Sequence, residues 1–269
     1  MSIVANLLKA PSELAALLAG YNCVQNDVGR SGSRVYRCEK NGHVLYLKIA
    51  PASEEMRRER DLLVWLRYKV PAPLVWDWHE KDGLSYLLTT ECEGHMACDM
   101  SGDCIHKPAE KTIERMAEGL RMLQAVDIQD CPYDNALDKK LASALWNIEN
   151  GKVDMADFAD NGKFDTPMAL YHWLAANKPP EELCFTHGDY CLPNVFIDDE
   201  KVAGFIDLGS GGIADRYQDI MMCIRSIGYN SQGLTQAEQE RLIALLFTHL
   251  GIEPNKEKLE YYRLLDELF

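Results

Sequence analysis

The sequence predicts an α+β fold of two lobes, a small antiparallel β-sheet lobe with a helix and a larger, mainly helical lobe. Two observations predict it. Short β-type runs joined by tight-turn dipeptides fill the first part of the chain, and amphipathic helical patterns dominate after Gly94. A length of 269 residues suits one large or two moderate domains. We expect residues 1–94 to form the N-terminal lobe, with a connection near 90–94, and residues 95–269 to form the C-terminal lobe.

The elements of the N-terminal lobe follow from local signals. Ser12 can cap a helix over the segment ELAALLAG. Two strand-type runs meet around an Asn-Gly pair at 41–42, and two more meet around an Asp-Gly pair at 82–83; both dipeptides favour hairpins. Between the two pairs of strands, apolar residues at helical spacing predict a helix over residues 54–68.

The C-terminal lobe should be built mainly from amphipathic helices and one short hairpin. The hairpin lies in VFIDDEKVAGFIDLG, with its turn near 198–201. The helical patterns cover residues 110–126, 135–150, 166–177, 235–250 and 256–268.

Composition narrows the class of protein. There are 28 basic residues against 42 acidic ones, which gives a formal net charge of −14. This charge disfavours nucleic acid and anionic membranes as partners and attracts cations. The alternative is that the charge serves solubility alone. No apolar run approaches the ~20 residues that span a bilayer, and the N-terminus does not resemble a signal peptide. Nine cysteines without a C-x-x-C pair argue against a disulfide framework. We expect a cytoplasmic monomer or weak dimer.

The stretch FTHGDYCLPNVFIDDEKVAGFIDLG carries the most informative pattern. Asp189 is followed five residues later by Asn194, and Asp207 comes after the apolar GFI of the next strand. In kinases one aspartate orients the nucleophilic hydroxyl, an asparagine on the same loop holds magnesium, and a later aspartate holds magnesium that bridges the phosphates. His-Gly-Asp alone is ordinary turn chemistry. The ordered set predicts Asp189 as catalytic base and Asn194 and Asp207 as metal ligands.

The N-terminal lobe offers the rest of such a nucleotide site. Lys48 ends the strand VLYLK, and Tyr46 shares its face because strand side chains alternate. A kinase needs a strand lysine for the phosphates and a helix glutamate to hold it. Glu59 is our candidate, with Glu54 or Glu55 as alternatives. Upstream, the turn GRSGS could cover phosphates through backbone N–H groups, although G-x-x-x-x-G-K-[ST] occurs nowhere.

These motifs resemble the aminoglycoside phosphotransferases, kinase-like enzymes that phosphorylate antibiotic hydroxyls, and above all the 3′-phosphotransferases. The matching segments span nearly the whole chain and follow that family's order: YLK, RERDLLVWL, DIQDCPYDN, FTHGDYCLPNVF, GFIDLG, ADRYQDI and YYRLLDELF. The resemblance implies a protein-kinase-like fold, ATP or GTP and Mg²⁺ as cofactors, and phosphorylation of the 3′-hydroxyl of kanamycin- or neomycin-type antibiotics.

The resemblance also implies roles for individual residues. On the nucleotide side it implies Lys48 paired with Glu59, Tyr46 stacked on the purine, Ser31 near the phosphates, and backbone groups around Thr90 and Cys92 holding the base. On the substrate side it implies acids of the 154–165 loop, among them Asp157 and Asp160, and the C-terminal Asp266, Glu267 and Phe269. Carboxylates suit a polycationic aminoglycoside, although a solvated acidic loop is the simpler explanation of the 154–165 segment.

Three departures from the family pattern fall on the substrate side. Ser210 stands where an arginine is usual, and Ala159 and Tyr229 stand where acids are usual. They put the antibiotic spectrum in question. The alternatives are a kinase of the same fold that acts on a macrolide or another small alcohol, and a non-catalytic nucleotide-binding module. Retention of all five kinase-type residues argues against the module.

Overall fold

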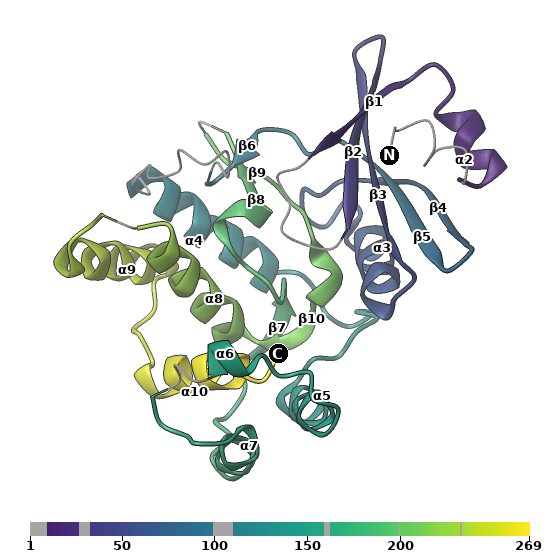
Figure 1. Cartoon of the computed structure of the whole chain (residues 1–269). Helices are drawn as coiled ribbons and strands as arrows, with labels where there is room; N and C mark the ends of the chain where they lie inside the picture. Colours follow the sequence, from purple (N-terminus) through teal and green to yellow (C-terminus); the bar gives the residue numbers. More distant parts are fainter. Residues whose placement is uncertain (1–9, 27–32, 99–109, 159–161, 199, 232) are drawn as a thin grey trace. The chain divides into compact units, whose positions relative to one another are not determined.

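The computed structural model divides the chain into two compact units (Figure 1). Unit 1 contains residues 1–104 together with 193–210, and unit 2 contains residues 105–192 together with 211–269. The structure describes residues 10–26, 33–98, 110–158, 162–198, 200–231 and 233–269. Unit 1 is rich in strands and unit 2 in helices, so the predicted α+β class is confirmed.

Unit 1 is organised around a five-stranded antiparallel sheet in the order β1-β2-β3-β5-β4. Both predicted hairpin turns are present. The Asn-Gly pair at 41–42 and the Asp-Gly pair at 82–83 have positive φ at both positions, as the tight turns of two-residue hairpins require. The strands are β1 (Asn22–Asn26), β2 (Arg34–Lys40), β3 (His43–Pro51), β4 (Val75–Lys81) and β5 (Leu84–Thr90).

Side-chain alternation gives the two faces of this sheet different roles. On β3, Leu45, Leu47 and Ile49 are buried in a core that also takes Leu14 of α2 (Ser12–Leu17). The intervening Tyr46 and Lys48 therefore point to the opposite face. Burial of alternate β3 residues in this core fixes which face Lys48 presents.

Helix α3 (Glu54–Leu66) lies after β3 and is capped by the Ser53 side chain, which accepts a hydrogen bond from the Met56 N–H. Unit 1 also has a three-stranded sheet in the order β6-β8-β9, followed by the short helix η2. Their bounds are β6 (His95–Met96), β8 (Val195–Ile197), β9 (Val202–Phe205) and η2 (Leu208–Ser210).

One disulfide corrects the expectation drawn from cysteine usage. Cys23 and Cys38 are direct partners in the register of β1 and β2, and their sulfur atoms are bonded. Sequence separation alone did not reveal this pairing, because it depends on strand register. The other cysteines of the described segments form no disulfide.

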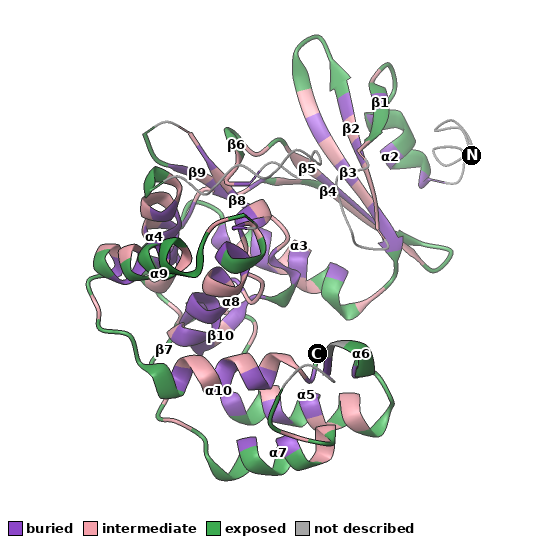
Figure 2. Ribbon diagram, turned by 60° about the vertical axis from the view of Figure 1, so that its left-hand side comes forward, coloured by how far each residue is buried: buried purple, intermediate pink, exposed green. Residues whose placement is uncertain are grey.

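Unit 2 combines helices with the two-stranded antiparallel ribbon β7–β10. Figure 2 shows that α8 and β10 are largely buried. Among the described residues, no helix is long and apolar enough to cross a membrane. The elements are α4 (Glu110–Gln124), α5 (Leu137–Glu149), α6 (Met155–Phe158), α7 (Pro167–Ala176), β7 (Leu183–Thr186), β10 (Gly212–Asp215), α8 (Arg216–Tyr229), α9 (Gln236–Leu250) and α10 (Lys256–Asp266).

Helix α8 was absent from the sequence-based prediction. Its first turns are buried nearly all round, and the buried positions include the polar residues Gln218, Asp219 and Ser226. Because polar side chains share its buried face, the spacing of its apolar residues alone did not mark this helix.

Candidate functional site

The charged cluster of unit 1 centres on Lys48. Its Nζ lies 2.8 Å from Glu59 Oε2 and 2.7 Å from Asp207 Oδ1. Lys48 lies on β3 and Glu59 on α3. Asp207 follows Ile206, directly after the end of β9. Of the three glutamates considered on α3, Glu59 is therefore the one that contacts Lys48.

Burial and the neighbouring charges shift the pKa of Lys48 in opposite directions. Loss of water around Lys48 lowers its pKa, but the charges of Glu59 and Asp207 and their hydrogen bonds outweigh burial, so the pKa of Lys48 is raised. The ammonium group is thus cationic at any physiological pH. It can neutralise phosphate oxygens, as a kinase lysine must.

The β8–β9 hairpin brings the two predicted metal ligands to one end. Val195 pairs with Phe205, and the Ile206 N–H donates to the Asn194 carbonyl oxygen at 3.0 Å. Asn194 precedes β8 and Asp207 follows Ile206, so both lie beside the same pair of strand ends. Asp207 has a φ of 59°, a left-handed conformation that is uncommon outside glycine and that Asp tolerates better than most residues.

Helix η2 ties this hairpin to α3. The Arg58 Nε donates to the Gly209 carbonyl oxygen at 3.1 Å, and Leu208 is fully buried. A Cβ on Gly209 would lie 3.0 Å from the Glu55 backbone oxygen, so a larger residue would push η2 off the helix. The close approach of η2 to α3 therefore sets how Asp207 meets the Lys48–Glu59 pair.

The predicted magnesium ligands have suitable chemistry. Asn194 offers an amide oxygen and Asp207 a carboxylate, the hard oxygen donors that Mg²⁺ prefers alongside phosphate oxygens and water. Within the described ranges, no cluster of three His, Cys, Asp or Glu side chains could hold a metal by itself. A magnesium ion here would rely on the nucleotide for further ligands.

The residues predicted around the base have different surroundings. Tyr46 lies on the Lys48 face of β3. The Thr90 N–H donates to the Leu74 carbonyl oxygen, and the Thr90 hydroxyl accepts from the Leu74 N–H. Thr90 therefore joins the end of β5 to the residue that precedes β4. Cys92 packs against Gly204, and burial raises the pKa of its thiol to about 12. Ser31 lies outside the described residues.

Asp189 lies in unit 2, on the loop that follows β7. Two backbone N–H groups of this loop donate to one buried carboxylate of α8: His187 N to Asp219 Oδ2 at 2.6 Å, and Gly188 N to Asp219 Oδ1 at 2.9 Å. Gly188 has a φ of 82°, which suits glycine. Asp219 therefore fixes the two residues that immediately precede the predicted catalytic base. No role was predicted for Asp219, because helix α8 was not predicted.

The loop is also anchored after Asp189. The Tyr190 hydroxyl donates to the Met116 carbonyl oxygen of α4 at 2.7 Å, and the Leu192 N–H donates to the Ser226 hydroxyl of α8 at 2.9 Å. Tyr190 is fully buried. The loop that carries Asp189 is thus anchored on both sides, which suits a residue predicted to orient an attacking hydroxyl.

The C-terminal residues predicted to bind substrate are ordered against α5 and α8. Leu268 is fully buried, and its carbonyl oxygen accepts from Asn147 of α5 at 2.9 Å. Lys140 Nζ lies 4.2 Å from the centre of the Phe269 ring. The segment is therefore a packed part of unit 2.

Both predicted acids of this segment carry an arginine partner. Asp266 pairs with Arg225 of α8, and Glu267 Oε1 lies 3.2 Å from Arg263. Burial raises the pKa of Asp266, Arg225 opposes that rise, and the negative charge of Asp189 adds to it. The charge of Asp189, the predicted base, therefore acts on the C-terminal segment.

The other residues predicted on the substrate side are only partly described. Asp157 falls within α6, but the position of its side chain is not described, and Ala159 and Asp160 lie outside the described residues. Tyr229, one of the departures from the family pattern, ends α8 and accepts a hydrogen bond from Arg225 at 3.4 Å.

Comparisons with known proteins agree with this arrangement. A model of the phosphotransferase enzyme family matches residues 23–262. An aminoglycoside 3′-phosphotransferase of Enterococcus faecalis is 39% identical over 97% of this chain and 99% of the relative. Another from Niallia circulans is 39% identical over 96% of this chain and 97% of the relative.

Solved structures give the same result. The crystal structure of an aminoglycoside-3′-phosphotransferase of type VIII aligns with a TM-score of 0.79 at 29% identity, covering 95% of this chain and 97% of that one. The Streptomyces rimosus aminoglycoside phosphotransferase APH(3″)-Id, in complex with ADP and streptomycin, aligns with a TM-score of 0.75 at 26% identity, covering 100% and 99%.

Proposed function

This chain belongs to the aminoglycoside 3′-phosphotransferases of the phosphotransferase enzyme family, and from that premise we propose that it transfers the γ-phosphoryl group of ATP to the 3′-hydroxyl of kanamycin- or neomycin-type aminoglycosides. Phosphorylation of the antibiotic would make the cell resistant to it. The observation that carries the proposal is the contact of Lys48 with both Glu59 and Asp207. This is the charge arrangement that kinases use around nucleotide phosphates.

We assign the nucleotide side to unit 1. Lys48 would neutralise the α- and β-phosphates, and Glu59 would hold its ammonium group in place. Asn194 and Asp207 would hold magnesium, which when bound bridges phosphate oxygens and offsets their charge. Tyr46 would stack on the purine, with Ser31 and the segment at Thr90 and Cys92 completing the nucleotide contacts. GTP is the alternative nucleotide.

We assign the base to Asp189 in unit 2. Its carboxylate would orient the 3′-hydroxyl and accept its proton as the phosphoryl group is transferred. Such a group typically contributes about 10²–10⁴-fold, whereas positioning and charge neutralisation supply most of the acceleration in phosphoryl transfer. The anchoring of this loop by Asp219 supports the assignment.

We assign recognition of the antibiotic to Asp266, Glu267 and Phe269, together with Asp157 and Asp160. Aminoglycosides are polycations, so carboxylates are the complementary groups. Arg225 and Arg263 already pair with the two C-terminal acids. An antibiotic ammonium must therefore compete with an arginine, and its affinity reflects the difference between the two pairings.

A substrate panel tests the proposal. Purified protein with ATP, or with GTP, is assayed against kanamycin, a 3′-deoxy aminoglycoside and a macrolide. We expect phosphorylation of kanamycin and none of the 3′-deoxy compound. Turnover of the macrolide alone would replace our proposal with the same-fold alternative, and absence of any phosphorylation with retained nucleotide binding would favour a non-catalytic module.

The Asp189→Ala variant tests the assigned base. We expect kcat to fall by about 10²–10⁴-fold while nucleotide affinity stays within about twofold, because the nucleotide contacts are assigned to unit 1. Near-normal phosphorylation of kanamycin by this variant would refute the role of Asp189.

Deletion of residues 267–269 tests the assigned substrate segment. We expect KM for kanamycin to rise and KM for ATP to stay within about twofold. Equal effects on both constants would argue against a substrate role for this segment.

A further inference from the structure

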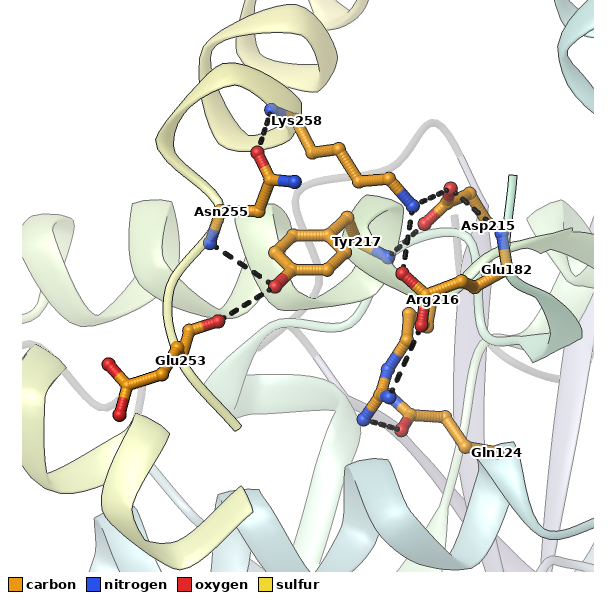
Figure 3. A network of polar contacts seen from close by, with 8 residues as sticks. All are labelled: Gln124, Glu182, Asp215, Arg216, Tyr217, Glu253, Asn255 and Lys258. Carbon is orange, nitrogen blue, oxygen red and sulfur yellow. Dashed lines mark hydrogen bonds and ion pairs between the residues drawn. The ribbon is translucent and has the colours of Figure 1, made fainter. Parts of the chain in front are cut away.

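An ion-pair network centred on the buried Lys258 and Asp215 joins α10 to the start of α8 (Figure 3). Lys258, near the N-terminus of α10, is only 3% exposed, and its Nζ lies 2.8 Å from Asp215 Oδ2 and 3.0 Å from Glu182 Oε1. The same Nζ lies 5.2 Å from the centre of the Tyr217 ring. A lysine this deeply buried requires full pairing, which the network provides.

Asp215 is the centre of this network. Its carboxylate caps α8 by accepting from the Tyr217 N–H at 2.8 Å, and it accepts from the Glu182 N–H at 3.1 Å. It is itself the last residue of β10, opposite Leu183 of β7. At the other end of this ribbon lies Thr186, which leads directly into the loop of Asp189. Lys258 therefore ties α10 to the same ribbon that carries the catalytic loop.

Tyr217 and Asn255 strengthen the same joint. The Tyr217 hydroxyl donates to the Glu253 carbonyl oxygen at 3.1 Å and accepts from the Asn255 N–H at 3.2 Å. The Asn255 side chain caps α10 by accepting from the Lys258 N–H at 3.0 Å. The chain that enters α10 is thus held on α8, as Figure 3 shows.

Two side-chain contacts join α8 to α10, and they are separated by the same number of residues on each helix. Tyr217 meets Lys258 near the N-terminal ends, and eight residues later on each helix Arg225 meets Asp266. Equal spacing on both helices means that they run side by side in the same direction. The first joint is buried, whereas the second uses a carboxylate that the proposed function assigns to the antibiotic.

We propose that Lys258 is a positioning residue for the acceptor substrate. By fixing the N-terminal end of α10 on Asp215, it sets where Asp266 and Glu267 lie relative to Asp189, including when an antibiotic ammonium draws Asp266 away from Arg225. This inference rests on the proposed function of the C-terminal acids. It adds a residue that does not itself touch the antibiotic.

The test compares Lys258→Met with Lys256→Met, a matched control at an exposed position of the same helix. For Lys258→Met we expect KM for kanamycin to rise about tenfold or more, while KM for ATP and the slow hydrolysis of ATP without antibiotic stay within about twofold. The control should match the wild type in all three. Unchanged kanamycin KM, or equal losses in all three quantities, would overturn the proposal.

A second measurement separates positioning from general stability. The Lys258→Met change is repeated in a chain that carries Asp266→Ala and lacks residues 267–269. If Lys258 acts through these residues, it should change kanamycin KM by less than about twofold in this background. An undiminished tenfold effect would overturn the proposal.

Tyr217→Phe keeps the proposal testable should Lys258→Met not fold. This variant removes the hydroxyl that holds Asn255 and Glu253 but leaves the ring, so we expect a smaller rise confined to kanamycin KM. No change, or an equal change in ATP KM, would count against the proposal. If the wild-type protein does not phosphorylate kanamycin at all, the proposed function fails before this comparison begins.

Discussion

The Asp219→Asn substitution tests whether the buried carboxylate of α8 positions the catalytic base. Asp219 is 2% exposed and accepts from two backbone N–H groups at 2.6 and 2.9 Å. An asparagine of the same shape keeps one oxygen as acceptor but turns its NH₂ group toward the other N–H. One donor is then left unsatisfied in the interior.

The expected magnitude follows from that single lost partner. A buried unsatisfied group costs about 1–3 kcal/mol, and in a chain of this size each kcal/mol lowers Tm by about 2–4 °C. Relaxation of the loop to relieve the mismatch would move Asp189, and a displacement of ~1 Å can cost on the order of 10²-fold in rate. We therefore expect a fall of about 10²-fold in kcat with a modest fall in Tm.

The assay is steady-state phosphorylation of kanamycin, with thermal unfolding and nucleotide titration on the same samples. Asp138→Asn is a matched control, because Asp138 is an exposed acid of unit 2 whose pair with Lys178 lies on the surface. It should change kcat by less than twofold. A kcat of Asp219→Asn equal to that of the control would refute the reasoning.

Three further predictions concern the charged clusters and one close contact. Lys48→Met should lower kcat/KM for ATP by on the order of 10²-fold; a value within threefold of wild type in steady-state kinetics would contradict it. Gly204→Ala should destabilise unit 1 by about 1–3 kcal/mol, because the new Cβ would lie 2.3 Å from the Cys92 Sγ. In thermal unfolding, adding Cys92→Ala should restore the lost stability. Burial raises the pKa of Asp266 and Arg225 opposes that rise, so Arg225→Gln should raise it further. Asp266 is protonated below its pKa and then no longer attracts an ammonium group, so the acid limb of kcat/KM for kanamycin should move to higher pH, and an unchanged pH profile would exclude this role.

Local chemistry in the sequence was enough to predict most of unit 1. The two hairpin dipeptides specify their turns, and the alternation along VLYLK places Lys48 and Tyr46 on one face. The choice of Glu59 among three glutamates followed from the order of motifs, and the structure has Glu59 in contact with Lys48. Signals of this kind depend on residues close together in sequence.

The features that escaped prediction depend on contacts between distant residues. The first turns of α8 are buried nearly all round, and their buried positions include polar residues, so apolar spacing alone did not mark the helix. No role was predicted for Asp219 or Lys258, because only the folded chain brings them to the loop at Gly188 and to Asp215. Strand register likewise decided the Cys23 pairing.

The division of unit 1 between two stretches of chain has a consequence for biosynthesis. Residues 193–210 leave the ribosome only after residues 105–192 of unit 2, about 90 residues, have been made. At about 5–20 residues per second, this delay lasts roughly 4–18 s. During that time the strands of the five-stranded sheet can pair, but Lys48 and Glu59 lack their contact with Asp207. The groups assigned to phosphate and magnesium therefore come together late, and the nascent N-terminal lobe does not yet contain the whole of the proposed nucleotide site.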